Sequence, residues 1–357
     1  MELQKRLDGF VQLGRFLNQF LNPTDKYVEK EKYQPYFDKL NHAVKTANHD
    51  NGWFTQDNVI TALAAIAESL EESKLYLWIS SYEKRLAGLR NPKRVRVMMA
   101  GNIPMVGFHD MLCVLMSGNI FIGKVSSQDK HLIPLLSEVL IFIEPQFSNF
   151  IFFTDRQLKE MDAIIATGSN NSSRYFDYYF GKYPHIIRKN RNSVAVLSGS
   201  ETTDDLQRLG KDIFQYFGLG CRNVSKLFVP EGYDFDLFFK AMFPYKDIIN
   251  HQKYANNYDY HKTIYLMNSV KLLDNNFLLL KEDIGLSSPV AVVYYEYYKN
   301  REVLEERLRM DSPYIQCIVS ADAGNVISTV CFGETQCPQL TDYADGINTM
   351  QFLIGLN

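Results

Sequence analysis

The sequence lacks a long apolar run, an excess of charge of one sign and any paired cysteine motif. Its most apolar stretch, residues 131–145, is interrupted by Pro134 and Glu138 and is shorter than the roughly 18 residues that a membrane span needs. The 38 basic and 41 acidic residues give a net charge of −3, which leaves no basic footprint for nucleic acid. The five cysteines form no Cys-x-x-Cys pair, so neither a disulfide framework nor a metal site is expected.

The amino-terminal residues 1–17 mix charges and have no apolar core with a cleavage site, unlike a secretory signal. Reduced thiols are typical of proteins in the cytosol, so the sequence predicts a cytoplasmic protein.

The 357 residues suffice for two domains. The first ninety residues carry apolar side chains at three- and four-residue spacing, which predicts helices. From residue 95 onward, apolar strand-like runs alternate with helical patterns, for example 95–100, 119–125, 149–154 and 162–168. Runs that are apolar on both faces are typical of buried parallel strands, so this alternation predicts βαβ units around parallel sheets.

Cys221 is the first candidate for chemistry. It follows Gly218 and Gly220 in a loop between an expected helix and the expected strand 224–229. Glycines allow the backbone to bend and to approach a ligand closely, and a thiolate is a strong nucleophile. The alternative is a small buried apolar residue. The run 218–223 begins like a dinucleotide fingerprint, but Asn223 stands where the third glycine belongs, so that motif is excluded.

Asn102 follows the end of the expected strand 95–100. Its amide could donate to an oxyanion, or it could serve only the turn. Thr167, Gly168 and Ser169 lie between a buried strand and a helix, a place that suits a phosphate, or Ser169 could simply cap the helix.

Lys124 ends another expected strand and is followed by Ser126 and Ser127. These side chains could contact a ribose or a phosphate, and the alternative is a solvated lysine beside serines that cap the next helix.

Taken in order, six segments resemble the aldehyde dehydrogenase superfamily and, more narrowly, its LuxC-type acyl-CoA reductase branch, the reductase of fatty acid reductase systems. The resemblance covers roughly residues 95 to 355. The segments are GNIPMVGFHDMLCVLMSGN, GKVSSQD, AIIATGSNNSS, FGLGCRNVSKLFVP, EDIGLSSPVAVVYYE and DYADGINTMQFL.

The resemblance implies an aldehyde-dehydrogenase-like α/β fold with two Rossmann-like lobes. A cofactor lobe covers residues 1–197 and includes the helical region of about 1–90, and a catalytic lobe covers residues 198–335. The segment 336–357 returns to the first lobe or serves oligomerisation. It makes Cys221 the nucleophile and Asn102 the oxyanion donor. The cofactor-binding residues that it implies are Lys124, Ser126, Ser127, Thr167, Gly168, Ser169 and Glu282, with Asp283 in place of Glu282 under a one-residue shift.

Two departures from the family pattern refine the expectation. Arg188 stands where hydrolytic members carry a glutamate base, and without that base water attack on an acyl-enzyme is poorly assisted. Ser127 stands where members that prefer NAD often carry a glutamate. Removing that carboxylate removes its repulsion of a 2′-phosphate, so the resemblance favours NADP(H).

The resemblance therefore implies NADPH-dependent reduction of a long-chain acyl thioester, either acyl-CoA or acyl-protein, to the aldehyde through an acyl-Cys221 intermediate. It also suggests a homo-oligomer and an acyl-protein synthetase partner. The alternatives are an acyl-phosphate reductase, an oxidative aldehyde dehydrogenase and, in another class, a non-catalytic cofactor-binding or acyl-transfer subunit.

Overall fold

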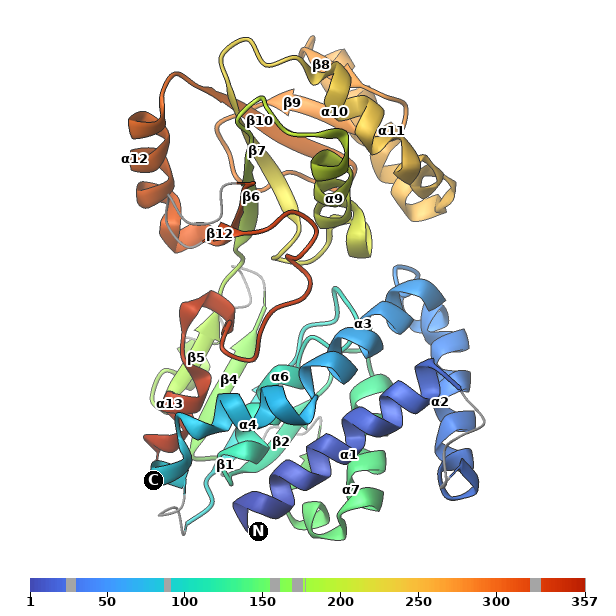
Figure 1. The fold of residues 1–357 in the computed structure, drawn as a ribbon, viewed down its shortest axis with the longest axis vertical. Helices are drawn as coiled ribbons and strands as arrows, with labels where there is room; N and C mark the ends of the chain where they lie inside the picture. Colours follow the sequence, from blue (N-terminus) through green and yellow to red (C-terminus); the bar gives the residue numbers. More distant parts are fainter. Residues whose placement is uncertain are drawn as a thin grey trace. The chain divides into compact units, whose positions relative to one another are not determined.

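The computed structural model describes residues 1–23, 30–86, 91–154, 161–168, 176, 178–321 and 329–356. The chain forms two units (Figure 1): Met1–Lys189 with Gln339–Asn357, and Asn190–Pro338. The sequence-based boundary lies between 197 and 198, eight residues later than the boundary of the units. The difference arises because residues 192–196 form a strand that is hydrogen-bonded within the second unit's sheet.

The helical amino-terminal region is confirmed. Its helices are α1 (Leu3–Leu21), α2 (Lys30–Asp50), α3 (Gln56–Ser69), α4 (Glu72–Ser80) and α5 (Glu83–Leu86). The apolar side of α1 is buried, with Phe10, Leu13 and Leu17 fully inaccessible to solvent. A Cβ on Gly14 would meet Leu70 at 2.8 Å, so α1 and the end of α3 are in close contact. Burial of this apolar stripe is what stabilises such helices.

The first unit contains a five-stranded parallel sheet in the order β3-β2-β1-β4-β5. The strands are β1 (Arg94–Met98), β2 (Ile120–Lys124), β3 (Ile151–Phe153), β4 (Ala163–Thr167) and β5 (His185–Arg188). The first four were predicted, and β5 was not. The chain moves from β1 to β2 on one side and to β4 on the other, so the topological switch point lies between β1 and β4.

Helices α6 (Phe108–Met116) and α7 (Leu132–Ile143) connect these strands and were both predicted. The carboxyl-terminal helix α13 (Thr349–Ile354) belongs to the same unit and contacts α6. The helix expected over 155–161 falls almost entirely outside the described residues.

The second unit has a seven-stranded sheet in the order β12-β11-β6-β7-β10-β9-β8, parallel except for the antiparallel edge strand β8. The strands are β6 (Asn192–Val196), β7 (Val224–Pro230), β8 (Leu272–Asp274), β9 (Leu279–Glu282), β10 (Val292–Tyr298), β11 (Ile315–Val319) and β12 (Thr329–Val330). Parallel sheets need both faces covered.

Helices cover the two faces of this second sheet separately (Figure 1). Helices α9 (Thr203–Phe214) and α10 (Phe235–Met242) pack with one side of β7, and α11 (Gln252–Met267) follows them. On the other face, α12 (Arg301–Asp311) contributes Leu304 and Leu308 to a separate cluster with Phe228. The α/β class with two mainly parallel sheets is therefore confirmed.

None of the helices in the described ranges is both long and apolar enough to cross a membrane. Across those same residues, no group of three or more His, Cys, Asp or Glu side chains could hold a metal ion.

Candidate functional site

A cavity of about 500 Å³ opens at the carboxyl ends of β1, β2 and β4 in the first unit. Open α/β sheets bind ligands at this edge, beside the topological switch point. Four residues predicted from the sequence line the cavity together. The described lining residues are Met98, Met99, Lys124, Val125, Ser126, Ser127, Lys130, Thr167 and Phe176.

The polar part of this lining suits an anion. It contains two lysines and three hydroxyl groups, and no carboxylate occurs among the lining residues that the structure describes. The sequence pattern missed Lys130. A turn precedes Lys130, in which the Asp129 N–H donates to Ser126 O at 3.1 Å. This turn brings Lys130 to the cavity lining. The Lys130 ammonium also pairs with Asp50 at 2.8 Å. Lys124 and the three hydroxyl donors fit the phosphates of a dinucleotide.

Two other cofactor residues were predicted beside this strand end. Gly168 directly follows β4 and is half-buried. Ser169 lies outside the described residues. Their contact with a cofactor stays a prediction.

The loop Gly101–Gly107 carries Asn102 between β1 and α6, and the Asn102 side chain is exposed. The loop fits closely against its surroundings. A Cβ on Gly101 would lie 2.5 Å from Ser126 Oγ, and one on Gly107 would lie 2.2 Å from Met99 Cγ. Glycine at both positions lets this loop lie against the residues that line the cavity.

Cys221 is exposed at the turn that precedes β7 in the second unit. Before it, Tyr216, Phe217 and Gly218 adopt positive φ angles of 52°, 58° and 76°. Two consecutive non-glycine residues in this region carry strain, a feature that concentrates at functional sites. The structure therefore presents a solvent-accessible thiol on a strained loop, not the buried apolar residue that was its alternative.

Asn223, the residue that excluded the dinucleotide fingerprint, organises this loop. Its buried side chain donates to the carbonyls of Asp212 and Gln215 at 2.9 and 2.8 Å and accepts the Gly220 N–H at 2.8 Å. It thereby ties the Cys221 turn to the end of α9. No sequence pattern indicated this role, because its partners were recognisable only once α9 and the turn were placed.

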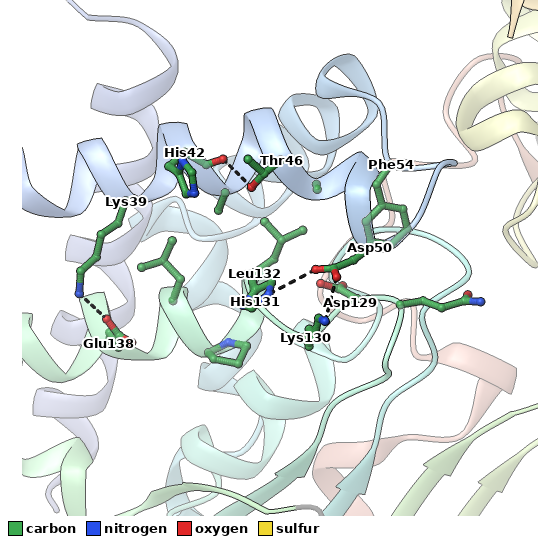
Figure 2. Close-up of a pocket in the computed structure, with 15 residues that line it drawn as sticks. Lys39, His42, Thr46, Asp50, Phe54, Asp129, Lys130, His131, Leu132 and Glu138 are labelled. Carbon is green, nitrogen blue, oxygen red and sulfur yellow. Dashed lines mark hydrogen bonds and ion pairs between the residues drawn. The ribbon is translucent and has the colours of Figure 1, made fainter.

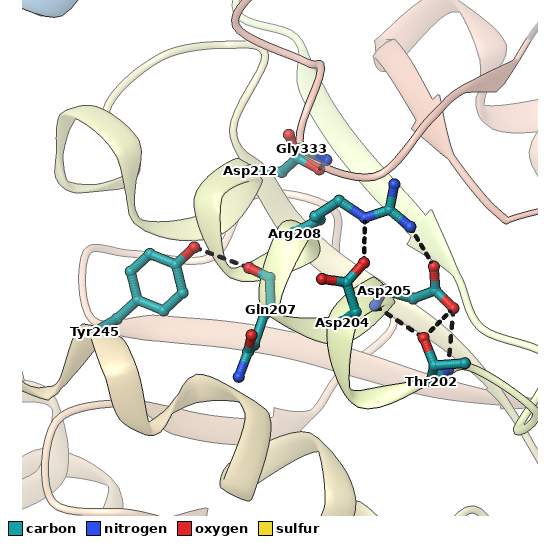
Figure 3. Close-up of polar contacts among 8 residues, drawn as sticks. All are labelled: Thr202, Asp204, Asp205, Gln207, Arg208, Asp212, Tyr245 and Gly333. Atoms are coloured by element: carbon teal, nitrogen blue, oxygen red, sulfur yellow. Dashed lines mark hydrogen bonds and ion pairs between the residues drawn. The ribbon is translucent and has the colours of Figure 1, made fainter.

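Helix α9 is itself firmly held (Figure 3). Thr202 and Asp205 form a capping box at its start. The Tyr245 hydroxyl donates to Gln207 O at 2.8 Å. Near its end, the buried Asp212 accepts the Gly333 N–H at 2.6 Å. The end of α9 is thus a fixed support for the turn that carries Cys221.

Two neighbours of Cys221 have defined contacts. Ser193 Oγ donates to the Cys221 carbonyl at 3.0 Å. The guanidinium of Arg222, the next residue in the chain, donates to the buried Cys317 Sγ at 3.3 Å.

Glu282 and Asp283 end β9, and their carboxyl groups differ. Asp283 pairs with Lys281 at 2.5 Å and accepts the Gly285 N–H at 2.8 Å. Burial would raise the pKa of Asp283, but the hydrogen bonds from Lys281 and Gly285 and the nearby lysine charges together outweigh it and lower that pKa. Glu282 is exposed. The engaged state of Asp283 favours Glu282 as the residue open to a ligand.

Arg188 is buried in the first unit, where it makes a two-pronged ion pair with Asp110 at 2.5 and 2.7 Å. It also donates to Thr349 Oγ1 of α13 at 3.1 Å. Burial would lower the pKa of Arg188, but the Asp110 carboxylate outweighs that effect and raises it. Arg188 is therefore a permanent cation and offers no base.

The sequence model of the acyl-CoA reductase (LuxC) family matches residues 64–238. This chain therefore contains a segment that is similar to the LuxC acyl-CoA reductase family. The segment contains Asn102, the cavity residues on β2 and β4, and Cys221, whereas Glu282 lies beyond it. No curated protein matches the sequence significantly.

Solved structures share the fold of this chain. Aldehyde dehydrogenase 21 from Physcomitrella patens, in complex with the reaction product succinate, has a TM-score of 0.62 and 12% identity, covering 98% of this chain and 87% of that chain. An NADP-dependent enzyme from E. coli has a TM-score of 0.58 and 11% identity over 89% and 77% of the two chains. The Delta-pyrroline-5-carboxylate dehydrogenase from Mycobacterium tuberculosis has a TM-score of 0.56 and 13% identity over 90% and 66%. At these identities the likeness shows the fold alone.

The LuxC match and the aldehyde dehydrogenase fold together support an oxidoreductase that acts on aldehyde or acyl groups, and they imply a nicotinamide cofactor. The cavity at the end of β1, β2 and β4 is compatible with such a cofactor, because its polar lining is cationic and hydroxylic.

Proposed function

We propose that this protein reduces a long-chain acyl thioester, acyl-CoA or acyl-protein, to the aldehyde with NADPH, through an acyl group bound to Cys221. The observation that carries the proposal is an exposed cysteine on a strained turn inside the LuxC segment. A reactive thiol must be accessible to its substrate.

In the proposed reaction, the Cys221 thiolate forms a bond from Sγ to the thioester carbonyl carbon. The negative charge that develops on the carbonyl oxygen is stabilised by donors from Asn102 Nδ2 and the Cys221 N–H. Breaking the carbon–sulfur bond to the donor releases its thiolate, which takes up a proton, and leaves an acyl-Cys221. The bound nicotinamide supplies the hydride that reduces this acyl group. Collapse of the thiohemiacetal on Cys221 then releases the aldehyde and restores the thiolate.

Arg188 supports acyl transfer over hydrolysis. It occupies the place expected for a water-activating glutamate, and its guanidinium is bound to Asp110. Since a guanidinium cannot accept a proton from water, the acyl-enzyme should persist until it is reduced. This favours the reductase over the oxidative alternative.

The reaction can be tested by intact-protein mass spectrometry of the wild type mixed with a long-chain acyl-CoA. We expect a mass gain of one acyl group that is stable without NADPH and disappears as aldehyde forms when NADPH is added. Rapid loss without NADPH would favour an oxidative aldehyde dehydrogenase. Labelling only by an acyl phosphate would favour the acyl-phosphate reductase, and NADPH binding without turnover would favour the non-catalytic subunit.

Preference for NADPH is supported by the lining of the cavity, which contains the Lys124 cation and, among its described residues, no carboxylate. A charge-assisted bond to a phosphate contributes about 1.5–3 kcal/mol. We therefore expect Lys124→Met to raise KM for NADPH by about tenfold or more and to change KM for NADH much less. The control is Lys39→Met, which removes a lysine paired with Glu138 outside this cavity. Equal losses with both cofactors would contradict the assignment of Lys124 to the 2′-phosphate.

A homo-oligomeric state, an acyl-protein synthetase partner and a cytoplasmic location are further parts of this proposal. They rest on the family resemblance and on the sequence composition.

A further inference from the structure

Buried side chains hold the Asn102 loop on both sides of Asn102. Before it, the Asn51 amide Nδ2 donates to the Gly101 carbonyl at 3.0 Å. After it, the Met105 N–H donates to Asp129 Oδ2 at 2.7 Å. Asn51 and Asp129 expose only 4% and 6% of their surfaces. Both contacts reach the loop backbone, so they constrain its path directly.

Asn51 has a fixed orientation of its own. It follows α2, where its N–H donates to Ala47 O at 3.1 Å, and its Oδ1 accepts the Trp53 N–H at 3.1 Å. With Oδ1 engaged in this way, Nδ2 is directed at Gly101. Asn51 lies outside the LuxC match, which starts at residue 64. A residue before the family match thus contacts the Asn102 loop, which lies inside the match.

Asp129 is costly to bury. Burial raises the pKa of its carboxyl to about 6, and its Oδ1 finds no hydrogen-bond partner in the described structure. The neighbouring Lys130 and His131 side chains contact Asp50 instead, at 2.8 and 3.3 Å (Figure 2). A buried carboxylate with an unused oxygen destabilises a fold.

What Asp129 does provide is a backbone contact. It accepts the N–H of Met105. Met105 has a φ of 58°, an unfavourable angle for a residue with a side chain. The Asp129 bond therefore stabilises the loop in a conformation that it would not adopt without support.

We infer that Asn51 and Asp129 are positioning residues that hold Asn102 in the conformation its oxyanion role requires. The inference rests on the proposed function. With Gly101 already against Ser126, the loop has contacts on both sides of Asn102. Displacing a catalytic group by about 1 Å can cost about 10²-fold in rate.

The test is the rate of Cys221 acylation by acyl-CoA in a single turnover, followed by mass spectrometry. We expect Asn51→Ala to slow acylation by roughly 10- to 100-fold. In an Asn102→Ala background, the same substitution should slow it by less than about threefold, because the group that it positions is gone. An equal loss in both backgrounds, or no loss in the first, would overturn the inference.

Asn58→Ala is the matched control. Asn58 is a buried asparagine of α3 whose Nδ2 donates to Trp53 O at 3.3 Å, a backbone group outside the Asn102 loop. We expect it to lower the melting temperature as much as Asn51→Ala does and to leave acylation unchanged. Asn51→Ala should leave the NADPH affinity unchanged within about twofold. A purely structural defect would lower both the acylation rate and the NADPH affinity.

A second pair of variants keeps the test decisive if Asn51→Ala fails to fold. Asp129→Ala should slow acylation, and Asp129→Asn, whose Oδ1 still accepts the Met105 N–H, should restore most of the rate. If both Asp129 variants are equally slow, the hydrogen bond to Met105 is not the cause and the inference fails. A wild type that is never acylated would instead refute the proposed function. Asn51 and Asp129 would then not position a catalytic group.

Discussion

Replacing Cys221 with alanine is expected to abolish covalent acylation and aldehyde formation, because the proposed reaction forms its thioester bond at Cys221 Sγ. An active-site nucleophile of this kind contributes about 10⁴–10⁶ in rate. The measurement is the acyl mass adduct with acyl-CoA, with aldehyde release followed after addition of NADPH. Binding of NADPH should be retained, since the cofactor cavity belongs to the first unit and Cys221 to the second.

The chain offers matched controls for this substitution. Cys331 and Cys337 are also exposed, so non-specific acylation of accessible thiols would label them as well. Cys331→Ala and Cys337→Ala should keep a single adduct and full turnover. An adduct of equal size on the Cys221→Ala protein would show that Cys221 is not the nucleophile.

Replacing Asp110 with alanine is expected to lower the free energy of unfolding by about 3–5 kcal/mol, since it leaves the buried Arg188 cation uncompensated. Both side chains are almost inaccessible, with 3% of Asp110 and 6% of Arg188 exposed. The partner Thr349 supplies only a hydroxyl acceptor at 3.1 Å. The loss can be measured from urea-induced unfolding of the full chain.

The comparison for this pair is Glu72→Ala at the exposed Arg15–Glu72 ion pair. Exposed pairs contribute about 0–1 kcal/mol, so this variant should unfold close to the wild type. Adding Arg188→Met to Asp110→Ala should recover much of the loss, because the second change removes the unpaired buried charge. If Asp110→Ala were no more destabilising than Glu72→Ala, Arg188 would not depend on this pair.

Much of the first unit could be predicted from local pattern. Apolar runs over 95–100, 119–125 and 162–168 predicted β1, β2 and β4, because a strand buried on both faces needs apolar residues without interruption. Strand ends in a parallel sheet meet at one edge. Polar residues that follow β2 and β4, such as Lys124 and Thr167, therefore had to come together. The structure places both on the lining of one cavity.

Short and irregular elements could not be predicted. Strand β5, with the sequence HIIR, and strand β8, with LLD, are too short to show a period. Each lies at or near the edge of a sheet, where hydrogen bonds to a neighbouring strand and not its own residue pattern make it a strand. The unit boundary was displaced for a related reason, because β6 is assigned by its pairing with β7 and β11.

The sequence by itself determined the α/β class, the order of the main strands and the cysteine, asparagine and lysine that the LuxC pattern singles out. These follow from the period of apolar residues and from short motifs, both of which are local in the chain. Only the tertiary structure decided that Asn51 supports the Asn102 loop and that Asn223 supports the Cys221 turn. It also decided that Lys130 joins the lining of the cavity at the ends of β1, β2 and β4 and that Arg188 is bound to Asp110. Each of these roles depends on a contact between groups from separate elements or from the two sides of a turn. The packing and register of the elements determine such contacts, and no residue pattern along the chain predicts them.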